Sequence, residues 1–218
     1  MTNRKGLLEE IGITEKEEDI NFTTWEEISK RKLTEEFMRE FDKNLNWSFL
    51  SVHQTLSENL MRDYKYEINW YSISKFQILT SKFIKDFRKK LDWSRISRYQ
   101  DLSEEFMSKY KTLLDWYEIC AYKALSEEFL IKEHKNIEWY YIMRNTNISE
   151  TTIMRCRDNI NFNELVYLRE CSFELLLKIV AKIRYTNIKY FKTEHLTNEQ
   201  KQQIQKILDV KNSFKKIV

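Results

Sequence analysis

Tryptophan recurs along this chain at a nearly constant interval. Successive tryptophans are separated by 22 residues once and by 23 residues thereafter, and they are Trp25, Trp47, Trp70, Trp93, Trp116 and Trp139. The same interval then reaches Phe162 and Tyr185, so the aromatic column continues after tryptophan has gone. Self-similarity at a fixed period is the signature of stacked repeats, in which each unit buries its apolar face against its neighbours. The spacing predicts a repeat array with the aromatic side chains buried between successive units.

Other residue types keep the same phase as tryptophan. An isoleucine or leucine lies three residues after each aromatic position, and a serine or cysteine follows it in the first five units. A hydroxyl residue recurs later in each unit and is a predicted helix N-cap, because its oxygen can accept a free N–H group of the first turn. These residues are Thr34, Ser57, Thr80, Ser103, Ser126 and Ser149. A second set of predicted caps precedes tryptophan and comprises Asn46, Asn69, Asp92 and Asp115.

The amino-acid composition favours helix throughout the chain. Proline is absent, and the two glycines, Gly6 and Gly12, lie near the N-terminus. Two short helices per unit would be unstable alone and must be held by their neighbours. We therefore predict an all-α chain, an α-solenoid of about seven to nine stacked two-helix repeats of 23 residues. The predicted parts are an N-terminal cap (1–24), the array (25–194, regular over 25–138 and degenerate over 139–194) and a C-terminal capping helix (195–218).

Charge and cysteine usage narrow the class of protein. Lys and Arg number 37 against 34 Asp and Glu, a net charge of +3, which argues against a strongly basic nucleic-acid-binding protein. No apolar run is long enough for a membrane span or a secretory signal. The cysteines, Cys120, Cys156 and Cys171, are odd in number and form no CxxC pair, which is typical of reduced thiols. We expect a soluble cytoplasmic protein that does not associate with membranes.

The sequence offers no catalytic, cofactor-binding or metal-binding constellation. His53 occupies a column that holds aromatic rings in later units, and His134 and His195 have no recurrent Cys, Asp or Ser partner nearby. Paired glutamates fall in predicted first turns, where the helix dipole accounts for them. No glycine-rich loop is present to bind phosphate. We predict that the protein is not an enzyme and uses no cofactor.

A candidate binding stripe runs along the first helix of the predicted units. Residues one and five positions after tryptophan share a helix face and are often aromatic or basic. The candidate partner-binding residues are Tyr71, Lys75, Arg98, Tyr117, Tyr140 and Arg144. Such residues are frequent in interfaces, although an ordinary solvated face has the same pattern. The glutamines Gln54, Gln77 and Gln100 could bind a peptide backbone or form hydrogen bonds between repeats.

The central units resemble a known kind of repeat. The segments WSRISRYQDLSEEF and WYSISKFQILTSKF are similar to tandem repeats of about this length in uncharacterised proteins of large DNA viruses and bacteriophages. The resemblance covers residues 25–138 and carries no active-site residue. It implies an interaction protein of viral origin that lies in the host cytoplasm.

Three functions are then in competition. The first is a scaffold that binds a protein partner, for example a viral or phage protein that inhibits a host defence nuclease. The alternative is nucleic-acid binding along the stripe, with further cations at Lys43, Lys65, Lys89, Lys90, Lys111 and Lys135. An enzyme is third, since only scattered carboxylates and histidines favour it.

Overall fold

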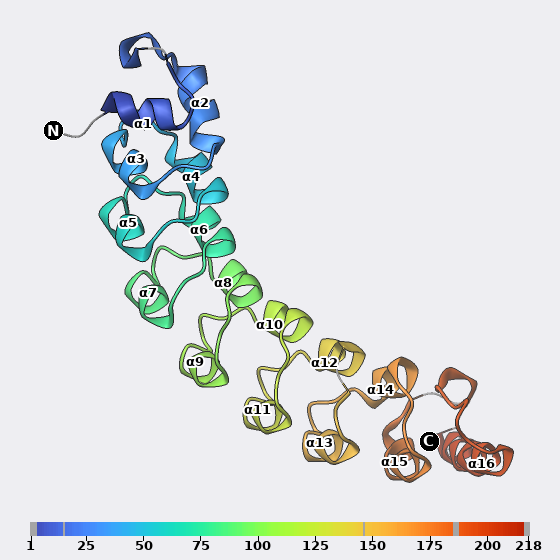
Figure 1. Cartoon of the computed structure of the whole chain (residues 1–218). Coiled ribbons are helices and arrows are strands. Elements are labelled where there is room, and N and C mark those ends of the chain that lie inside the picture. Colours follow the sequence, from blue (N-terminus) through green and yellow to red (C-terminus); the bar gives the residue numbers. More distant parts are fainter. Residues whose placement is uncertain (1–3, 15, 146, 185–187, 216–218) are drawn as a thin grey trace. The chain divides into compact units, whose positions relative to one another are not determined.

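The computed structural model describes residues 4–14, 16–145, 147–184 and 188–215. Within those ranges the chain is helical and has no strand (Figure 1). It forms two compact units, which we call unit 1 (Met1–Phe106) and unit 2 (Met107–Val218). The predicted aromatic position Tyr185 lies outside the described residues.

Seven pairs of short helices, each pair one repeat, make up most of the described chain. The pairs in unit 1 are α2 (Phe22–Lys30) with α3 (Glu35–Glu40), α4 (Trp47–His53) with α5 (Glu58–Asp63), and α6 (Trp70–Phe76) with α7 (Ser81–Asp86). Next come α8 (Trp93–Tyr99) and α9 (Glu104–Lys109), which spans the unit boundary. The pairs in unit 2 are α10 (Trp116–Tyr122) with α11 (Glu127–Lys132), α12 (Trp139–Asn145) with α13 (Glu150–Arg155), and α14 (Phe162–Leu168) with α15 (Phe173–Ile179). The predicted all-α solenoid of two-helix repeats is confirmed.

Additional helices lie outside these pairs. In unit 1, α1 (Arg4–Glu10) and the 3-10 helix η1 (Glu17–Asp19) precede the first repeat, and α2 already begins at Phe22, inside the segment assigned to the cap. The reason is local, because the Asn21 side chain accepts a hydrogen bond from the Thr24 N–H and caps α2 there. In unit 2, the last repeat is followed by η2 (Val180–Lys182), η3 (Ile188–Tyr190) and the long helix α16 (Asn198–Lys215).

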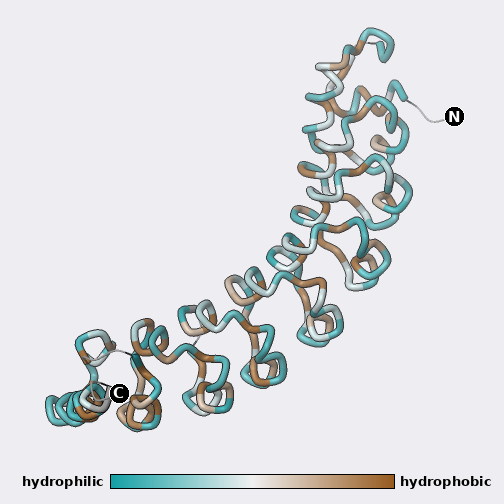
Figure 2. The backbone as a smooth tube through the Cα atoms, turned by 180° about the vertical axis from the view of Figure 1, so that it is seen from behind, coloured by the Kyte–Doolittle hydropathy of each residue, from teal (hydrophilic) through white to brown (hydrophobic). Residues whose placement is uncertain are grey.

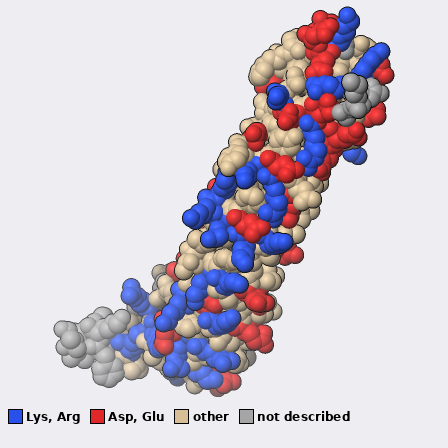
Figure 3. All heavy atoms as spheres, turned by 90° about the vertical axis from the view of Figure 1, so that its left-hand side faces the viewer, with Lys and Arg blue, Asp and Glu red and all other residues tan. Residues whose placement is uncertain are grey.

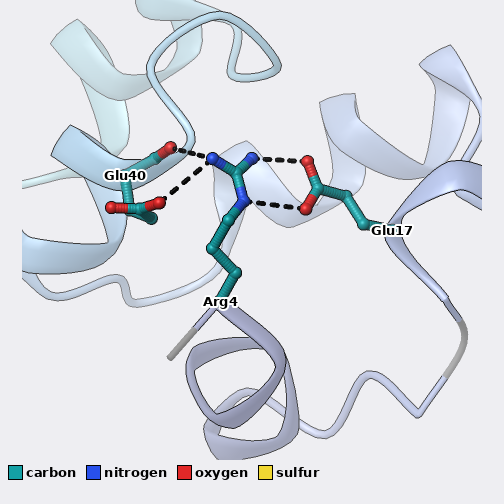
Figure 4. A network of polar contacts seen from close by, with 3 residues as sticks. All are labelled: Arg4, Glu17 and Glu40. Atoms are coloured by element: carbon teal, nitrogen blue, oxygen red, sulfur yellow. Dashed lines mark hydrogen bonds and ion pairs between the residues drawn. The ribbon is translucent and has the colours of Figure 1, made fainter. Parts of the chain in front are cut away.

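Arg4 attaches the N-terminal segment to the first repeat. Its guanidinium donates hydrogen bonds to the Glu17 carboxylate and, at 3.1 Å, to the Glu40 carboxylate at the end of α3 (Figure 4). It also lies 4.5 Å from the centroid of the Phe41 ring. The hydrogen bond with Glu17 raises the pKa of Arg4, so this cation is permanent.

The helices start where the sequence places their caps. Each hydroxyl of the Thr or Ser column accepts a hydrogen bond from the N–H three residues later, for instance Thr34 from Phe37 at 3.1 Å. The Asn or Asp before each of four tryptophans caps the first helix of its pair in the same way. Both cap columns continue into the degenerate part of the array, with Asn161 before the first helix α14 and Ser172 before the second helix α15. Both sets of predicted caps are confirmed.

The core contains a column of isoleucine and leucine side chains on the buried face of the first helices. These side chains are fully buried, and they are Ile28, Leu50, Ile73, Ile96, Ile119, Ile142 and Leu165. Figure 2 shows hydrophobic residues at corresponding places in successive pairs. The first helices pack directly on one another, α2 on α4, α4 on α6 and α6 on α8 in unit 1, and α10 on α12 and α12 on α14 in unit 2.

A buried serine fastens each of the first helices α2, α4 and α6 to the next repeat. The Ser51 hydroxyl donates to the Trp47 carbonyl oxygen at 2.7 Å and accepts from the Asn69 N–H, one repeat later, at 3.0 Å. Ser29 and Ser74 make the same two bonds. In unit 2, Cys120 takes this place and its Sγ accepts from the Glu138 N–H at 3.4 Å. The small residue therefore bonds successive repeats as well as allowing them to approach closely.

In three repeats of unit 1, a buried glutamine fastens the repeat to the preceding one. The Gln77 Oε1 accepts from the Leu56 N–H at 2.9 Å, and its Nε2 donates to the carbonyl oxygens of Ser51 and Gln54 at 3.2 and 2.8 Å. Gln54 and Gln100 repeat this arrangement. Of the two roles left open for these glutamines, the structure shows hydrogen bonding between repeats. Peptide capture is ruled out for them, since their amides are buried and already bonded.

The tryptophans lie between successive repeats, although not all are buried. The Trp47 ring stacks on Tyr64 of its own repeat with centroids 4.1 Å apart, and its Nε1–H donates to the carbonyl oxygen of Asp42, in the preceding repeat, at 3.0 Å. The same N–H bond to the residue five positions earlier occurs in the later repeats. Trp25, Trp47 and Trp139 are buried, whereas Trp70, Trp93 and Trp116 are partly exposed. The expectation of uniformly buried rings is therefore wrong for the central repeats.

Candidate interaction surfaces

The first helices of unit 1 present an exposed surface of rings and cations. We call this the unit 1 aromatic surface, and its members are Tyr71, Lys75, Phe76, Arg95, Arg98 and Tyr99. The three rings are 54%, 47% and 44% exposed, which is high for side chains of this size. Because α6 packs on α8, side chains from two successive repeats meet there. The predicted residues Tyr71, Lys75 and Arg98 thus belong to one surface.

Cations on this surface lie over the rings. The Arg95 guanidinium carbon is 3.3 Å from the centroid of the Tyr71 ring, and its Nη1 is 3.3 Å from the Asp92 carboxylate. The Lys75 ammonium lies between two rings, 4.6 Å from Phe76 and 5.3 Å from Tyr99. Such cation–π contacts hold long side chains in one conformation before a ligand arrives. The surface is therefore organised in the free protein.

Unit 2 carries a second aromatic surface on α10 and α12. Tyr117 and Tyr140, which are 47% and 38% exposed, both pack edge-on against Tyr141, with centroids 4.7 and 5.2 Å away. A hydrogen bond with Tyr117 raises the pKa of Tyr141. Arg144 is exposed one helical turn after Tyr140. The predicted residues Tyr117, Tyr140 and Arg144 therefore lie on neighbouring first helices, and the three tyrosines form one cluster.

Sequence reasoning missed two contributors to these surfaces. The column six residues after tryptophan, which holds His53 in an earlier repeat, contains Phe76, Tyr99 and Tyr122. All three rings are substantially exposed, as expected for the last turn of a short helix. Arg95 was missed because its column is not basic in other repeats. The 23-residue recurrence of exposed rings is the signal that could have identified the first group.

The histidines serve structural roles. His53 is exposed, with its ring 6.3 Å from Phe49. A ring nitrogen of His134 is 2.9 Å from the Ile131 carbonyl oxygen. His195 Nε2 lies 2.8 Å from the Cys171 carbonyl oxygen. The two later histidines thus lie within hydrogen-bond distance of backbone carbonyl oxygens, whereas His53 is a surface ring.

The recurrent glutamate at the start of the second helices connects repeats. The Glu127 carboxylate accepts hydrogen bonds from both the N–H and the hydroxyl of Ser149, each at 2.6 Å, and from Thr152. Glu150 bonds to Ser172 in the same way. The Ser149 hydroxyl is the strongest cause that lowers the pKa of Glu127. These acids therefore have a second role beyond the helix dipole, since they bind the N-cap of the next repeat.

The described residues also bear on metal binding, membrane insertion and thiol chemistry. Among the described residues, no group of three or more His, Cys, Asp and Glu side chains is arranged to hold a metal ion. A helix with the length and apolarity needed to cross a membrane is likewise not found in the described ranges. The three cysteines are free and buried, and burial raises the pKa of Cys120 to about 11 and that of Cys171 to about 12.

Comparisons with protein-family models, with curated proteins and with solved structures return no match for this chain. Its function is therefore inferred from the geometry of the repeats.

Proposed function

We propose that this protein is a non-enzymatic repeat scaffold that binds a protein partner through the exposed rings and cations of its first helices. The observation that carries the proposal is the unit 1 aromatic surface, where Lys75 and Arg95 are held over exposed rings. Tyrosine and arginine are enriched among the residues that dominate binding energies in interfaces. Side chains already ordered in the free protein lose less conformational entropy on binding.

The contacts that the buried isoleucine, serine and glutamine columns make between repeats, which we call the seam, support this role. Isoleucine, serine and glutamine side chains hold α4, α6 and α8 together from inside, so the outer face of these helices is a rigid platform. The charge of the surface favours a partner that presents carboxylates beside apolar side chains, because arginine pairs with carboxylates and the rings supply apolar area.

The repeat resemblance supports a viral or phage setting. In that setting we propose a cytoplasmic host protein as the partner, such as a defence nuclease that the scaffold occludes.

The test is capture followed by mutation. The full chain is immobilised, proteins retained from a host lysate are identified, and the affinity of a purified candidate is measured by calorimetry. The variant Tyr71→Ala/Arg95→Ala/Tyr99→Ala should bind about 10-fold or more weakly. Phe22→Ala/Leu113→Ala is the matched control, since it removes exposed apolar side chains elsewhere. Equal affinities of both variants and the wild type would refute the proposal.

A second candidate function, nucleic-acid binding, is favoured by one observation outside the first helices. The Tyr66 ring is 79% exposed, and the ammonium groups of Lys65 and Lys90 lie 5.1 and 4.8 Å from its centroid. An exposed ring between cations can stack on a base while lysines contact phosphate. Anisotropy measurements with labelled oligonucleotides should then show binding that weakens steeply with salt and with Tyr66→Ala. Absence of binding at low salt would exclude this function.

A further inference from the structure

The second helices of the two units differ in their exposed charges. In unit 1 an acid near the end of each second helix pairs with an arginine, at 2.8 Å for Arg39 with Asp63 and 2.9 Å for Arg62 with Asp86. The equivalent residues in unit 2 are basic, and they are Lys109, Lys132, Arg155 and Lys178. Whole-unit composition follows the same trend, with 18 Lys and Arg against 20 Asp and Glu in unit 1, and 19 against 14 in unit 2.

The cations of this column in unit 2 are exposed and mostly without an ion-pair partner. Within the described residues, Lys109, Lys132 and Arg155 form no ion pair, while Lys178 pairs with Glu174 at 2.6 Å. The column that holds Arg39 and Arg62 in unit 1 holds Ser108 and then the apolar residues Ile131, Met154 and Leu177 in unit 2. Figure 3 shows Lys and Arg over the middle and lower parts of the view, and Asp and Glu most frequent at its upper end. Unit 2 thus has unpaired cations beside apolar groups where unit 1 has ion pairs.

Two grooves separate the second helices of unit 2. One groove, of about 590 Å³, lies between the ends of α11 and α13 and is lined by Ile131, Lys135 and Arg155 among others. The other, of about 600 Å³, lies between α13 and α15 and is lined by Met154, Arg155, Leu175 and Lys178 among others. Arg155 lines both grooves and stands between them. Each groove has apolar and basic side chains, and acids line it as well, since Asp158 lines both grooves and Glu150 and Glu174 line the second.

The acids near these grooves are already engaged. Glu150 accepts hydrogen bonds from Ser172, and Glu174 pairs with Lys178. Asp158 lies 3.9 Å from the guanidinium of Arg157. These contacts leave Arg155 as the cation at the centre of the surface that is available to an incoming carboxylate.

From this arrangement we infer that unit 2 binds an acidic and hydrophobic peptide segment of a partner protein across α13. Helix axes in direct contact lie roughly 8 to 10 Å apart, so the grooves on the two sides of α13 are separated by about that distance or more. Residues i and i+3 of an extended peptide are separated by about 10 Å. Two leucines at that spacing can therefore enter successive grooves while an aspartate between them meets Arg155. This surface is distinct from the aromatic surfaces of the first helices.

The experiment uses a fluorescein-labelled probe peptide, Leu-Asp-Asp-Leu-Asp-Asp-Leu, and fluorescence anisotropy with the full chain. The probe should bind at least tenfold more tightly than two matched peptides, one with Asn replacing every Asp and one with Ser replacing every Leu. Arg155→Glu should weaken probe binding at least tenfold, and circular dichroism confirms its fold. Lys206→Glu is the matched control, because it makes the same charge change at an exposed position of α16.

Several outcomes would overturn the inference. Lack of probe binding at 1 mM would exclude the site. Equal binding of the peptide with Ser in place of Leu would show that the surface recognises the charge of the peptide and not its leucines. Tighter binding of oligothymidylate, abolished by Arg155→Glu, would make this a nucleic-acid surface. An Arg155→Glu variant that binds as the wild type would place the site elsewhere. The Tyr140→Ala variant should retain probe binding, so failure of this inference is distinguishable from failure of the first-helix scaffold.

Discussion

Replacing Gln77 by leucine tests the seam between repeats directly. The side chain is 5% exposed, and its amide satisfies one backbone N–H and two backbone carbonyl oxygens of the preceding repeat. Leucine has a similar volume but no polar atom, so Gln77→Leu leaves these three groups without that partner. The isoleucine column and the helix caps are unaffected by the change.

The expected cost follows from those unpaired groups. A buried backbone group that loses its hydrogen bond costs about 1 to 3 kcal/mol, and partial hydration reduces the sum when several groups lie together. We expect Gln77→Leu to lower the free energy of unfolding by about 3 kcal/mol. Gln77→Glu is the informative companion, because its second oxygen faces the carbonyl oxygens of Ser51 and Gln54. Only the protonated acid can donate to them, so this variant should gain stability as the pH falls from 8 to 5.

Two measurements check the reasoning. Urea unfolding followed by circular dichroism gives the change in stability, and hydrogen exchange measured by NMR reports the Leu56 amide, whose N–H donates to Gln77. The Leu56 amide should exchange much faster in Gln77→Leu. If stability changed by less than about 0.5 kcal/mol and Leu56 remained protected, glutamine would not hold the repeats together.

Three further predictions follow from the same packing. Trp47→Ala should destabilise the chain by about 3 to 5 kcal/mol, and Trp93→Ala by less because Trp93 is partly exposed, as urea unfolding of both variants will show. The pKa of Glu127 is lowered in the folded protein, so its carboxylate stabilises the fold above the unfolded pKa, and this contribution disappears as the pH falls through the folded pKa. Glu127→Gln should therefore flatten the dependence of melting temperature on pH between about 5 and 3. An unchanged slope would contradict this. Cys120 and Cys171 should react with a thiol reagent at pH 8 only after unfolding, since burial raises both pKa values, and fast labelling of the native protein would disprove their burial.

The repeat phase was enough to predict the architecture. A 3.6-residue period within a 23-residue period places the isoleucine column on a buried face, and the caps mark where each helix begins. Both are local properties, so they can be derived without knowing how repeats stack. The helices α3 to α11 and α13 each begin one residue after a predicted cap.

The stacking contacts themselves could not be derived from spacing. An amide such as that of Gln77 bonds equally well to a neighbouring backbone or to a foreign peptide, and the spacing does not show which way the side chain points. The same limit applies to Trp70, whose column is buried at one repeat and partly exposed at the next. The grooves beside Arg155 were missed because they depend on how far apart the second helices lie.

The seam and the surfaces use different positions of the repeat, and this separation matters for recognition. Residues at the isoleucine, serine and glutamine positions of unit 1 contact backbone groups of neighbouring repeats, so a change there alters the stacking. Residues such as Tyr71 and Arg155 contact little of the seam, so a change there alters only what the array presents to solvent. The shift from acidic to basic residues at the end of the second helices, between Asp86 and Lys109, occurs within an uninterrupted 23-residue period. One backbone pattern can therefore carry two chemically different exposed faces, because the side chains that hold the repeats together are not those exposed to solvent.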